Sequence, residues 1–190
     1  MNTIILASGS PRRRELLELA DVPFIVQTAD VDETLPEGIS PKEAVQLLAV
    51  KKARAVPAEN RLVLAADTVV ALDGKIFGKP RDREEAKAML RTLSGKTHQV
   101  HTGVCIRKGG REEIFCETAQ VTFYPLTEEE ISRYVDFGEP MDKAGAYGIQ
   151  GKGAVLVRRI EGDYYTIVGL PIARVVRALE KAEREASDSL

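Results

Sequence analysis

The 190-residue chain carries near its start the stretch LASGSPRRR, at residues 6–14. The apolar residues 4–7 lead into it, and apolar side chains recur at helical spacing after it, from Leu16 to Ala20. The stretch is therefore predicted to form the turn between a strand and a helix. Ser10 suits the N-cap position of that helix, and Pro11 suits its first turn. We interpret the rest of the chain around this strand-turn-helix unit.

The same stretch predicts a site for phosphate. Arginines at positions 12–14 set positive charge against the positive end of the helix dipole, at a cost of roughly 0.3–1 kcal/mol each. An anion bound between the first backbone N–H groups and the guanidinium groups would reverse the sign of this energy. Positive charge at the positive end of a helix is locally unfavourable, and such unfavourable placements are typical of functional sites. The alternative is a solvated basic helix start, since Arg14 at least can turn towards solvent.

Composition and net charge restrict the class of protein. Hydrophobic residues make up 44% of the chain, charged residues 29%, and the formal net charge is −2. These values are ordinary for a globular protein and argue against disorder. A surface that binds polymeric nucleic acid is usually basic, so we expect a small anionic ligand and no polymeric nucleic acid partner. The length suits a single domain over residues 1–190 or two small lobes that share a cleft.

Cysteine usage and hydropathy indicate in which cellular compartment the protein is expected. The two cysteines, Cys105 and Cys116, lie on apolar, strand-like runs and are interpreted as small core residues. The N-terminus lacks the layout of a signal peptide, and no apolar run approaches the roughly 20 residues that cross a membrane. We therefore expect a reducing, cytoplasmic location without membrane contact.

Strand and helix signals alternate along the chain. Strands are predicted at residues 24–27, 62–70, 97–107 and 113–124, and a last hairpin at 154–160 and 164–168. Capping boxes start helices at Ser40, Asp82 and Thr127. Asp73-Gly74 is predicted to form a hairpin turn. The order predicts an α/β fold.

Asp67 is the acid that the pattern singles out. It lies in the nearly continuous apolar run of residues 62–70, which suits a strand covered on both faces. A buried carboxylate requires a cation, a metal ion or hydrogen-bond donors, because leaving it unpaired costs several kcal/mol. The alternative reading is a structural pair with a nearby lysine. Glu33, with Asp30 and Asp32 beside it, could join Asp67 around a hard divalent ion or could simply be solvated.

Other nucleotide and metal motifs are excluded. Gly95-Lys96-Thr97 resembles the end of a P-loop, but Leu90 replaces the glycine that this motif requires. The residues 14–18 resemble the centre of a Nudix box, but the next glutamate and glycine are missing. His98 and His101 would point to opposite faces of a strand, which makes a shared zinc site unfavourable.

Five motifs together resemble the Maf family, nearly along the whole chain and in order. They are LASGSPRR at 6–13, ADTVV at 66–70, GKP at 78–80, LSGKTH at 93–98 and DKAGAYGIQG at 142–151. The resemblance implies the Maf/inosine-triphosphatase-like α/β fold, with an elongated mixed sheet flanked by helices and two lobes with a central cleft. It also implies a nucleoside triphosphate pyrophosphatase. The form of the last motif is similar to the branch that acts on dTTP and UTP.

The resemblance assigns roles to positions of this sequence. Asp67 matches the catalytic proton acceptor, and Glu33 and Asp67 are expected to hold Mg²⁺ or Mn²⁺. Positions associated with nucleotide choice are matched by Arg13, Thr68 and Gln150. Other polar positions of the pocket are matched by Ser8, Arg12, Lys52 and Lys79.

The expected reaction is metal-dependent hydrolysis between the α and β phosphates, which gives the nucleoside monophosphate and pyrophosphate. The family also carries the label of septum formation inhibitor. The alternative is therefore a nucleotide-binding regulator of cell division that has no turnover. A homodimer is the family-level expectation.

The irregular loop at residues 141–153 is predicted to read the base. Gln150 carries an amide acceptor and donor, which can meet the alternating edge of uracil or thymine, and glycines let the backbone approach a flat ring. We therefore expect dTTP and UTP ahead of CTP, ATP and GTP. The alternative is that Gln150 only pins the loop to the backbone.

Overall fold

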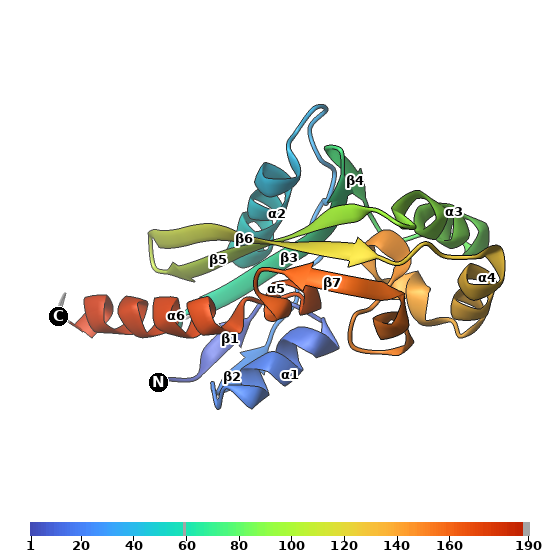
Figure 1. Ribbon diagram of the computed structural model, residues 1–190. Coiled ribbons are helices and arrows are strands. Elements are labelled where there is room, and N and C mark those ends of the chain that lie inside the picture. Colours follow the sequence, from blue (N-terminus) through green and yellow to red (C-terminus); the bar gives the residue numbers. More distant parts are fainter. Residues whose placement is uncertain (59, 188–190) are drawn as a thin grey trace. The chain divides into compact units, whose positions relative to one another are not determined.

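The computed structural model describes residues 1–58 and 60–187 and has the alternation of strands and helices that the sequence predicts (Figure 1). The strands are β1 (Ile4–Leu6), β2 (Phe24–Val26), β3 (Val63–Leu72), β4 (Lys75–Phe77), β5 (Thr97–Lys108), β6 (Arg111–Phe123) and β7 (Val157–Glu161). The α-helices are α1 (Pro11–Leu19), α2 (Pro41–Ala55), α3 (Arg83–Leu93), α4 (Glu128–Asp136), α5 (Tyr164–Val168) and α6 (Ile172–Ser187). Short 3₁₀ helices are η1 (Glu139–Asp142), η2 (Ala144–Ala146) and η3 (Lys152–Leu156).

The sheet is mixed, as predicted. Across the described residues its seven strands follow the order β2-β1-β3-β5-β6-β7, with β4 paired to β3. β1 runs parallel to both neighbours, so that Ile5 aligns with Ile25 of β2 and with Val63 of β3. β4 is antiparallel to β3, and β7 is antiparallel to β6. The predicted fold class, a mixed sheet flanked by helices, is confirmed.

The chain divides into two compact units. The first unit consists of Met1–Asp67, Thr102–Glu117 and Gly169–Leu190, and the second consists of Thr68–His101 and Thr118–Val168. The strands β3, β5 and β6 each pass from one unit into the other, because a unit boundary falls within each of them. The two lobes that the sequence predicts correspond to these units.

In the first unit, α2 packs on the strands through small side chains. Ala49 and Ala53 of α2 belong to one buried cluster with apolar side chains of β1 and β3 and with Cys105. The approach is closest at Gly103 of β5, where a Cβ atom would come within 2.7 Å of the backbone nitrogen of Gln46. A side chain at position 103 would therefore hold α2 away from the sheet.

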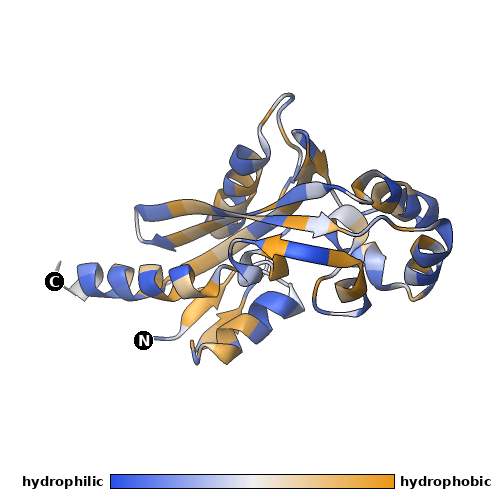
Figure 2. Cartoon of the chain, in the orientation of Figure 1, coloured by the Kyte–Doolittle hydropathy of each residue, from blue (hydrophilic) through white to orange (hydrophobic). Residues whose placement is uncertain are grey.

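Figure 1 shows α6 running along the turn end of β5 and β6, also within the first unit. Arg174 pairs with Glu117, and Lys181 pairs with Glu113 of β6. The Arg174 guanidinium also lies 4.1 Å from the ring centroid of Phe115. Figure 2 shows the matching hydropathy pattern: α6 is mostly hydrophilic, with hydrophobic positions on one side, whereas β1 and the first half of β3 are hydrophobic.

The second unit has its own core. α3 and α4 lie side by side in Figure 1 and are joined by the Arg91–Glu128 and Arg83–Asp136 ion pairs. Phe123 of β6, His98 of β5 and Tyr147 form a buried cluster of rings in edge-to-face contact. Each pair of ring centroids is 4.7–5.4 Å apart, the range in which edge-to-face packing is favourable.

The predicted helix starts are largely confirmed. α2 and α4 begin with reciprocal capping boxes, at Ser40 and at Thr127. Asp82 accepts the backbone N–H of Glu85, as predicted, but the Glu85 carboxylate binds the backbone N–H of Arg81 instead of that of Asp82. The predicted Asp73-Gly74 turn connects β3 and β4, and both residues have positive φ angles, as a two-residue hairpin requires.

The predicted hairpin at 154–160 and 164–168 is wrong. β7 starts only at Val157 and pairs with β6, and residues 164–168 form the helix α5. The reason is a local cap: the carboxylate of Asp163 accepts hydrogen bonds from the backbone N–H and the hydroxyl of Thr166, each 2.8 Å long. The apolar, β-branched content of the segment resembles a strand, but this cap starts a helical turn instead.

Among the helices of the described residues, none is both long enough and apolar enough to cross a membrane.

Candidate active site

Ser8 organises the turn between β1 and α1. Its hydroxyl accepts hydrogen bonds from the backbone N–H of Ser10 (3.3 Å) and from Nη1 of Arg13 (2.9 Å). Nε of Arg13 donates to the carbonyl oxygen of Gly169, also at 2.9 Å. The Ser10 side chain makes no capping hydrogen bond within the described chain. The first N–H groups of α1 can therefore serve an anion, as the sequence predicts for this turn.

Arg13 lies within electrostatic reach of the acidic residues of the first unit. Burial lowers the pKa of its guanidinium most; Asp67 then raises this pKa, Arg12 lowers it and Glu33 raises it, in decreasing order of effect. An arginine still remains protonated at physiological pH. Its positive charge thus lies beside both carboxylates that the sequence selected.

Lys52 joins these two carboxylates. Its Nζ atom lies 2.6 Å from Oδ1 of Asp67 and 2.8 Å from Oε1 of Glu33. The side chains of Lys52 and Asp67 are only 18% and 13% exposed, whereas that of Glu33 is 60% exposed. Lys52 and Asp67 therefore form a largely buried ion pair, and Glu33 contacts it from the solvent side. A lysine partner is what the structural alternative expects for Asp67, but a second carboxylate contacts the same ammonium, and both carboxylates act on the charge of Arg13.

The neighbouring Lys51 holds the loop that carries Glu33. Its Nζ atom donates to the carbonyl oxygens of Asp32 (2.9 Å) and Thr34 (3.3 Å), one on each side of Glu33. The Asp32 carboxylate accepts the backbone N–H of Thr34 at 2.9 Å. Hydrogen bonding to the Thr34 side chain and then to this N–H lowers the pKa of Asp32. Asp32 therefore also helps to hold its own loop. Sequence reasoning missed Lys51; the signal was two adjacent lysines on α2.

The location of this site follows from the parallel strands. Leu6, the last residue of β1, aligns with Leu64 of β3, so Ser8 and Asp67 both lie beyond the end of the paired register. Ligands of open α/β sheets bind at the carboxyl ends of the parallel strands. In the first unit, Ser8 contacts Arg13, and Lys52 contacts Asp67 and Glu33. The charges of Asp67, Arg12 and Glu33 act on Arg13, so contacts or charge link the six predicted residues of this unit.

The two carboxylates fit a hard divalent cation. The Lys52 ammonium already places one positive charge within 2.8 Å of both Asp67 and Glu33. Magnesium is usually bound through one or two carboxylates, with phosphate oxygens and water as the other ligands. Among the described residues, no three or more His, Cys, Asp or Glu side chains are grouped to hold a metal ion. Asp67 and Glu33 supply two carboxylates of the kind that such a cation prefers.

The other three predicted residues belong to the second unit. Thr68 follows Asp67 in β3 and is half-buried, whereas Lys79 and Gln150 are both exposed. The loop of Lys79 and the loop of Gln150 adjoin, because the carbonyl oxygen of Gly78 accepts the backbone N–H of Gly145 at 3.1 Å. This hydrogen bond joins the two glycine-containing segments within the second unit.

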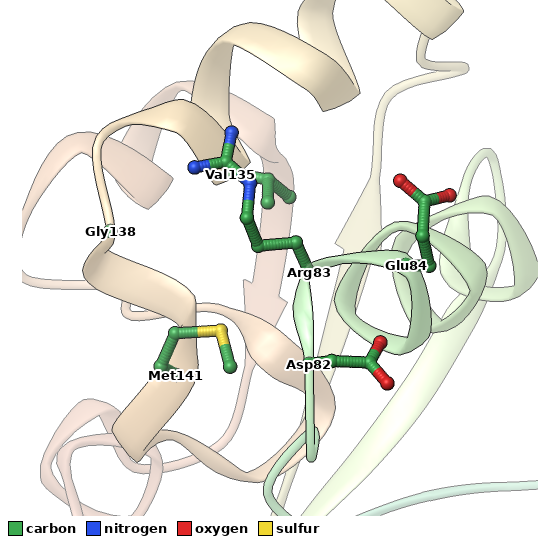
Figure 3. Close-up of a pocket in the computed structure, with 6 residues that line it drawn as sticks. All are labelled: Asp82, Arg83, Glu84, Val135, Gly138 and Met141. Carbon is green, nitrogen blue, oxygen red and sulfur yellow. The ribbon is translucent and has the colours of Figure 1, made fainter.

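The second unit also contains a pocket of about 580 Å³ at the start of α3 (Figure 3). Its lining residues are Asp82, Arg83, Glu84, Val135, Gly138 and Met141. The charged residues at its wall already have partners: Asp82 caps α3, Arg83 pairs with Asp136, and Glu84 pairs with Lys87. None of the predicted site residues lines it, and we assign it no role in the chemistry.

Cys105 takes the core role that the sequence favoured, Cys116 is only half-buried, and the two histidines have separate partners. His98 bonds Tyr147, and His101 bonds Thr118, so the two rings have different partners. Cys105 is fully buried, and burial raises the pKa of its thiol to about 11. A thiol with such a pKa is a poor nucleophile at neutral pH.

Residues 3–182 match the family described as Maf-like protein. The chain belongs to this family. The resemblance that the motifs indicated is therefore confirmed over almost the full length.

Curated relatives are similar over the same span. A protein of Bacillus velezensis named dTTP/UTP pyrophosphatase is 55% identical over 180 residues, which are 94% of this chain and 95% of the relative. A protein of Bacillus mycoides with the same name is 55% identical over 189 residues, or 98% and 99% of the two chains. Among solved structures, a HAM1 protein from Coxiella burnetii matches with a TM-score of 0.53 at 17% identity. It covers 95% of this chain and 100% of that one, a likeness that concerns the fold alone.

Proposed function

We propose that this protein is a nucleoside triphosphate pyrophosphatase that hydrolyses dTTP and UTP to the monophosphate and pyrophosphate. The observation that carries the proposal is the group formed by Asp67, Lys52 and Glu33 beside Arg13, in the first unit. It occurs in a chain 55% identical to proteins named dTTP/UTP pyrophosphatase. A module that only bound a tetra-anion would have no use for uncompensated carboxylates beside the phosphates unless a metal ion were bound there as well.

In the first unit, the basic residues are assigned to the phosphates and the acidic residues to the proton and the metal ion. Arg12, with the first-turn N–H groups of α1, binds the phosphates as hydrogen-bond donor and counter-charge. Arg13 is fastened to Ser8 and to the carbonyl oxygen of Gly169, so its guanidinium is held in place before the substrate binds. Such preorganised donors stabilise the negative charge that develops on the phosphates in the transition state.

Asp67 is the proton acceptor of the proposed reaction. The Lys52 ammonium contacts Oδ1, and we assign the second carboxylate oxygen of Asp67 to the attacking water. The ion pair with Lys52 orients the carboxylate, which a general base requires. Glu33 and Asp67 would hold Mg²⁺ or Mn²⁺, which when bound supplies positive charge to the phosphate oxygens.

The residues of the second unit are assigned to the nucleotide. We assign the amide of Gln150 to the base, Thr68 to nucleotide choice and Lys79 to phosphate. A uracil or thymine edge offers two acceptors and one donor, whereas cytosine exchanges one acceptor for a donor and lacks the N3 proton. Each polar group left unpaired with cytosine costs about 1–3 kcal/mol, which supports a preference for UTP and dTTP over CTP.

The test is a pyrophosphate assay on wild type and Asp67→Asn. The variant keeps the size of the side chain but cannot accept the proton, so turnover of UTP should fall by roughly 10²-fold or more. Glu112→Gln, which changes an acid of the first unit that pairs with Arg54 at the surface, is the matched control and should retain activity. Release of orthophosphate, or wild-type turnover by Asp67→Asn, would contradict the mechanism.

The alternative, a regulator that binds nucleotide without turnover, predicts tight binding of UTP and no product with any divalent ion. The proposal includes a homodimer, which sedimentation would detect, and a cytoplasmic location, which the low cysteine content of the sequence supports.

A further inference from the structure

The loop that carries Gln150 has little regular structure to hold it. Gln150 lies in a turn between η2 and η3 and is exposed. The glycines at positions 148, 151 and 153 lack the positive φ angles that would explain a need for glycine. A base-reading amide must nevertheless be presented at a defined position, because a misplaced donor discriminates poorly between bases. Some other group must therefore hold this segment.

Glu139, the first residue of η1, binds the segment on both sides of Gln150. Its Oε2 atom accepts the backbone N–H of Lys152 at 2.9 Å. Its Oε1 atom accepts the hydroxyl of Tyr134 at 3.4 Å, and the same hydroxyl accepts the backbone N–H of Gly148 at 3.0 Å. One carboxylate thus connects directly to the residue two after Gln150 and, through a phenol, to the residue two before it.

Side chains pack closely against two of these glycines. A Cβ atom at Gly151 would overlap the Glu139 carboxylate, and one at Gly148 would lie 2.8 Å from Cδ of Lys143. Lys143 in turn donates to the carbonyl oxygen of Glu139 at 2.7 Å. From the sequence, the glycines were expected to let the backbone approach the base. The structure indicates a different reason for glycine at these positions: the backbone lies against Glu139 and Lys143.

The Tyr134 side chain that supports Glu139 is buried. Tyr134 is 3% exposed, and burial raises its pKa, so its hydroxyl keeps its proton and can both donate and accept. The Lys152 ammonium lies 3.4 Å from the ring centroid of Phe137, which adds a second attachment at the same end of the segment. Gly138, with a φ angle of 75°, ends α4 and turns the chain so that Glu139 follows directly.

We propose that Glu139 is a positioning residue for base selectivity: its carboxylate clamps residues 148–152 and so fixes the amide of Gln150. The inference rests on the proposed function, because it needs Gln150 to contact the base. Its role is that of a hydrogen-bond acceptor, not of a charge. Glu139→Gln, which keeps an acceptor for Lys152, should therefore be close to wild type, whereas Glu139→Ala should not.

The experiment compares kcat and KM for UTP and CTP in wild type and both Glu139 variants. In Glu139→Ala we expect the ratio of kcat/KM for UTP to that for CTP to fall by about fivefold or more, mainly through KM for UTP. In Glu139→Gln the ratio should stay within about twofold of wild type. Glu129→Ala is the matched control, since Glu129 is a carboxylate of α4 in the same unit that pairs with Arg133 at the surface; its ratio should not change.

Hydrogen exchange of the nucleotide-free protein tests the clamp itself. The Lys152 amide should exchange about tenfold faster in Glu139→Ala than in wild type or Glu129→Ala. Tyr134→Phe keeps the buried ring and removes the hydroxyl, so it serves as a second variant if Glu139→Ala does not fold. In Tyr134→Phe we expect faster exchange of the Gly148 amide and a lower UTP/CTP ratio.

The outcomes distinguish failure of the inference from failure of the proposed function on which it rests. Unchanged exchange in Glu139→Ala would overturn the clamp, and faster exchange with an unchanged ratio, or an equal loss for both nucleotides, would overturn its role in selectivity. Equal losses in Glu139→Gln and Glu139→Ala would overturn the acceptor role. Wild-type protein that released no pyrophosphate would refute the proposed function and the inference with it, whereas failure of the inference alone leaves wild-type activity intact.

Discussion

The buried ring of His98 should make the stability of this protein depend on pH. His98 is 1% exposed, and burial lowers its pKa from 6.5 to about 4. Its Nε2 atom is 2.8 Å from the hydroxyl of Tyr147, and Nδ1 is buried without a hydrogen-bond partner among the described residues. A protonated ring would carry an N–H at each nitrogen and a charge inside an aromatic cluster. The folded state therefore requires the neutral ring.

The sign and size of the effect follow from this shift. Below pH 6.5 the unfolded chain binds a proton at His98 that the folded protein does not, so stability is highest above that pH and falls as pH decreases towards 4. The His98 contribution lost between pH 7.5 and pH 5 is about 2 kcal/mol, rising to about 3 kcal/mol at pH 4. Carboxylates with ordinary pKa values titrate mainly below this window, which makes the range from pH 7.5 to pH 5 the informative one.

Urea unfolding of wild type and His98→Gln measures this contribution. Glutamine does not titrate and can still bond Tyr147, so the variant should lose about 2 kcal/mol less than wild type on going from pH 7.5 to pH 5. Because the chain has two histidines, the imidazole signal of His98 can be assigned by NMR through its loss in the variant. Equal pH slopes in the two proteins, or a measured pKa of His98 near 6.5, would refute the reasoning.

Three further predictions concern the base, the metal ion and the packing of α2. Gln150→Ala should lower kcat/KM for UTP by about tenfold and narrow the gap to CTP; a uniform loss across nucleotides would mean that Gln150 only pins the loop. Chelation with EDTA should stop pyrophosphate release and Mg²⁺ should restore it, whereas undiminished turnover in EDTA would remove the metal ion from the mechanism. Gly103→Ala should lower the free energy of unfolding by about 1–3 kcal/mol, because the new methyl group meets the backbone of α2; Gly110→Ala, whose methyl would meet nothing within 4 Å, is the control in urea unfolding.

Short-range patterns determined most of the elements. The capping boxes at Ser40 and Thr127, the turn at Asp73-Gly74 and the strand through Asp67 were all predictable, because each depends on hydrogen bonds or apolar spacing within a few residues. Residues 164–168 were mispredicted as a strand for a related reason: one side-chain cap from Asp163 outweighed their β propensity.

The motifs also determined the candidate site residues and the family. Asp67 could be selected from the sequence alone, because a carboxylate in an apolar strand requires a partner, whereas Ser8 and the role of Arg13 were selected through the resemblance of their motif to the family. Their partners could not be selected in this way. These contacts join segments that are far apart in the chain. Lys52 bridges Asp67 and Glu33, Lys51 holds the acidic loop, and Arg13 is fastened to Gly169.

Only the tertiary structure decided what surrounds the loop of Gln150. In the sequence its glycines could serve a turn, a ligand or a close contact, and Glu139 is one acidic residue among many. The fold ends α4 at Asp136 and places the Glu139 carboxylate against Gly151 and the Lys152 amide. A hydrogen-bonding pattern within one segment can be recognised from residue types, whereas the partner of a backbone amide across a fold depends on where packing brings the two segments.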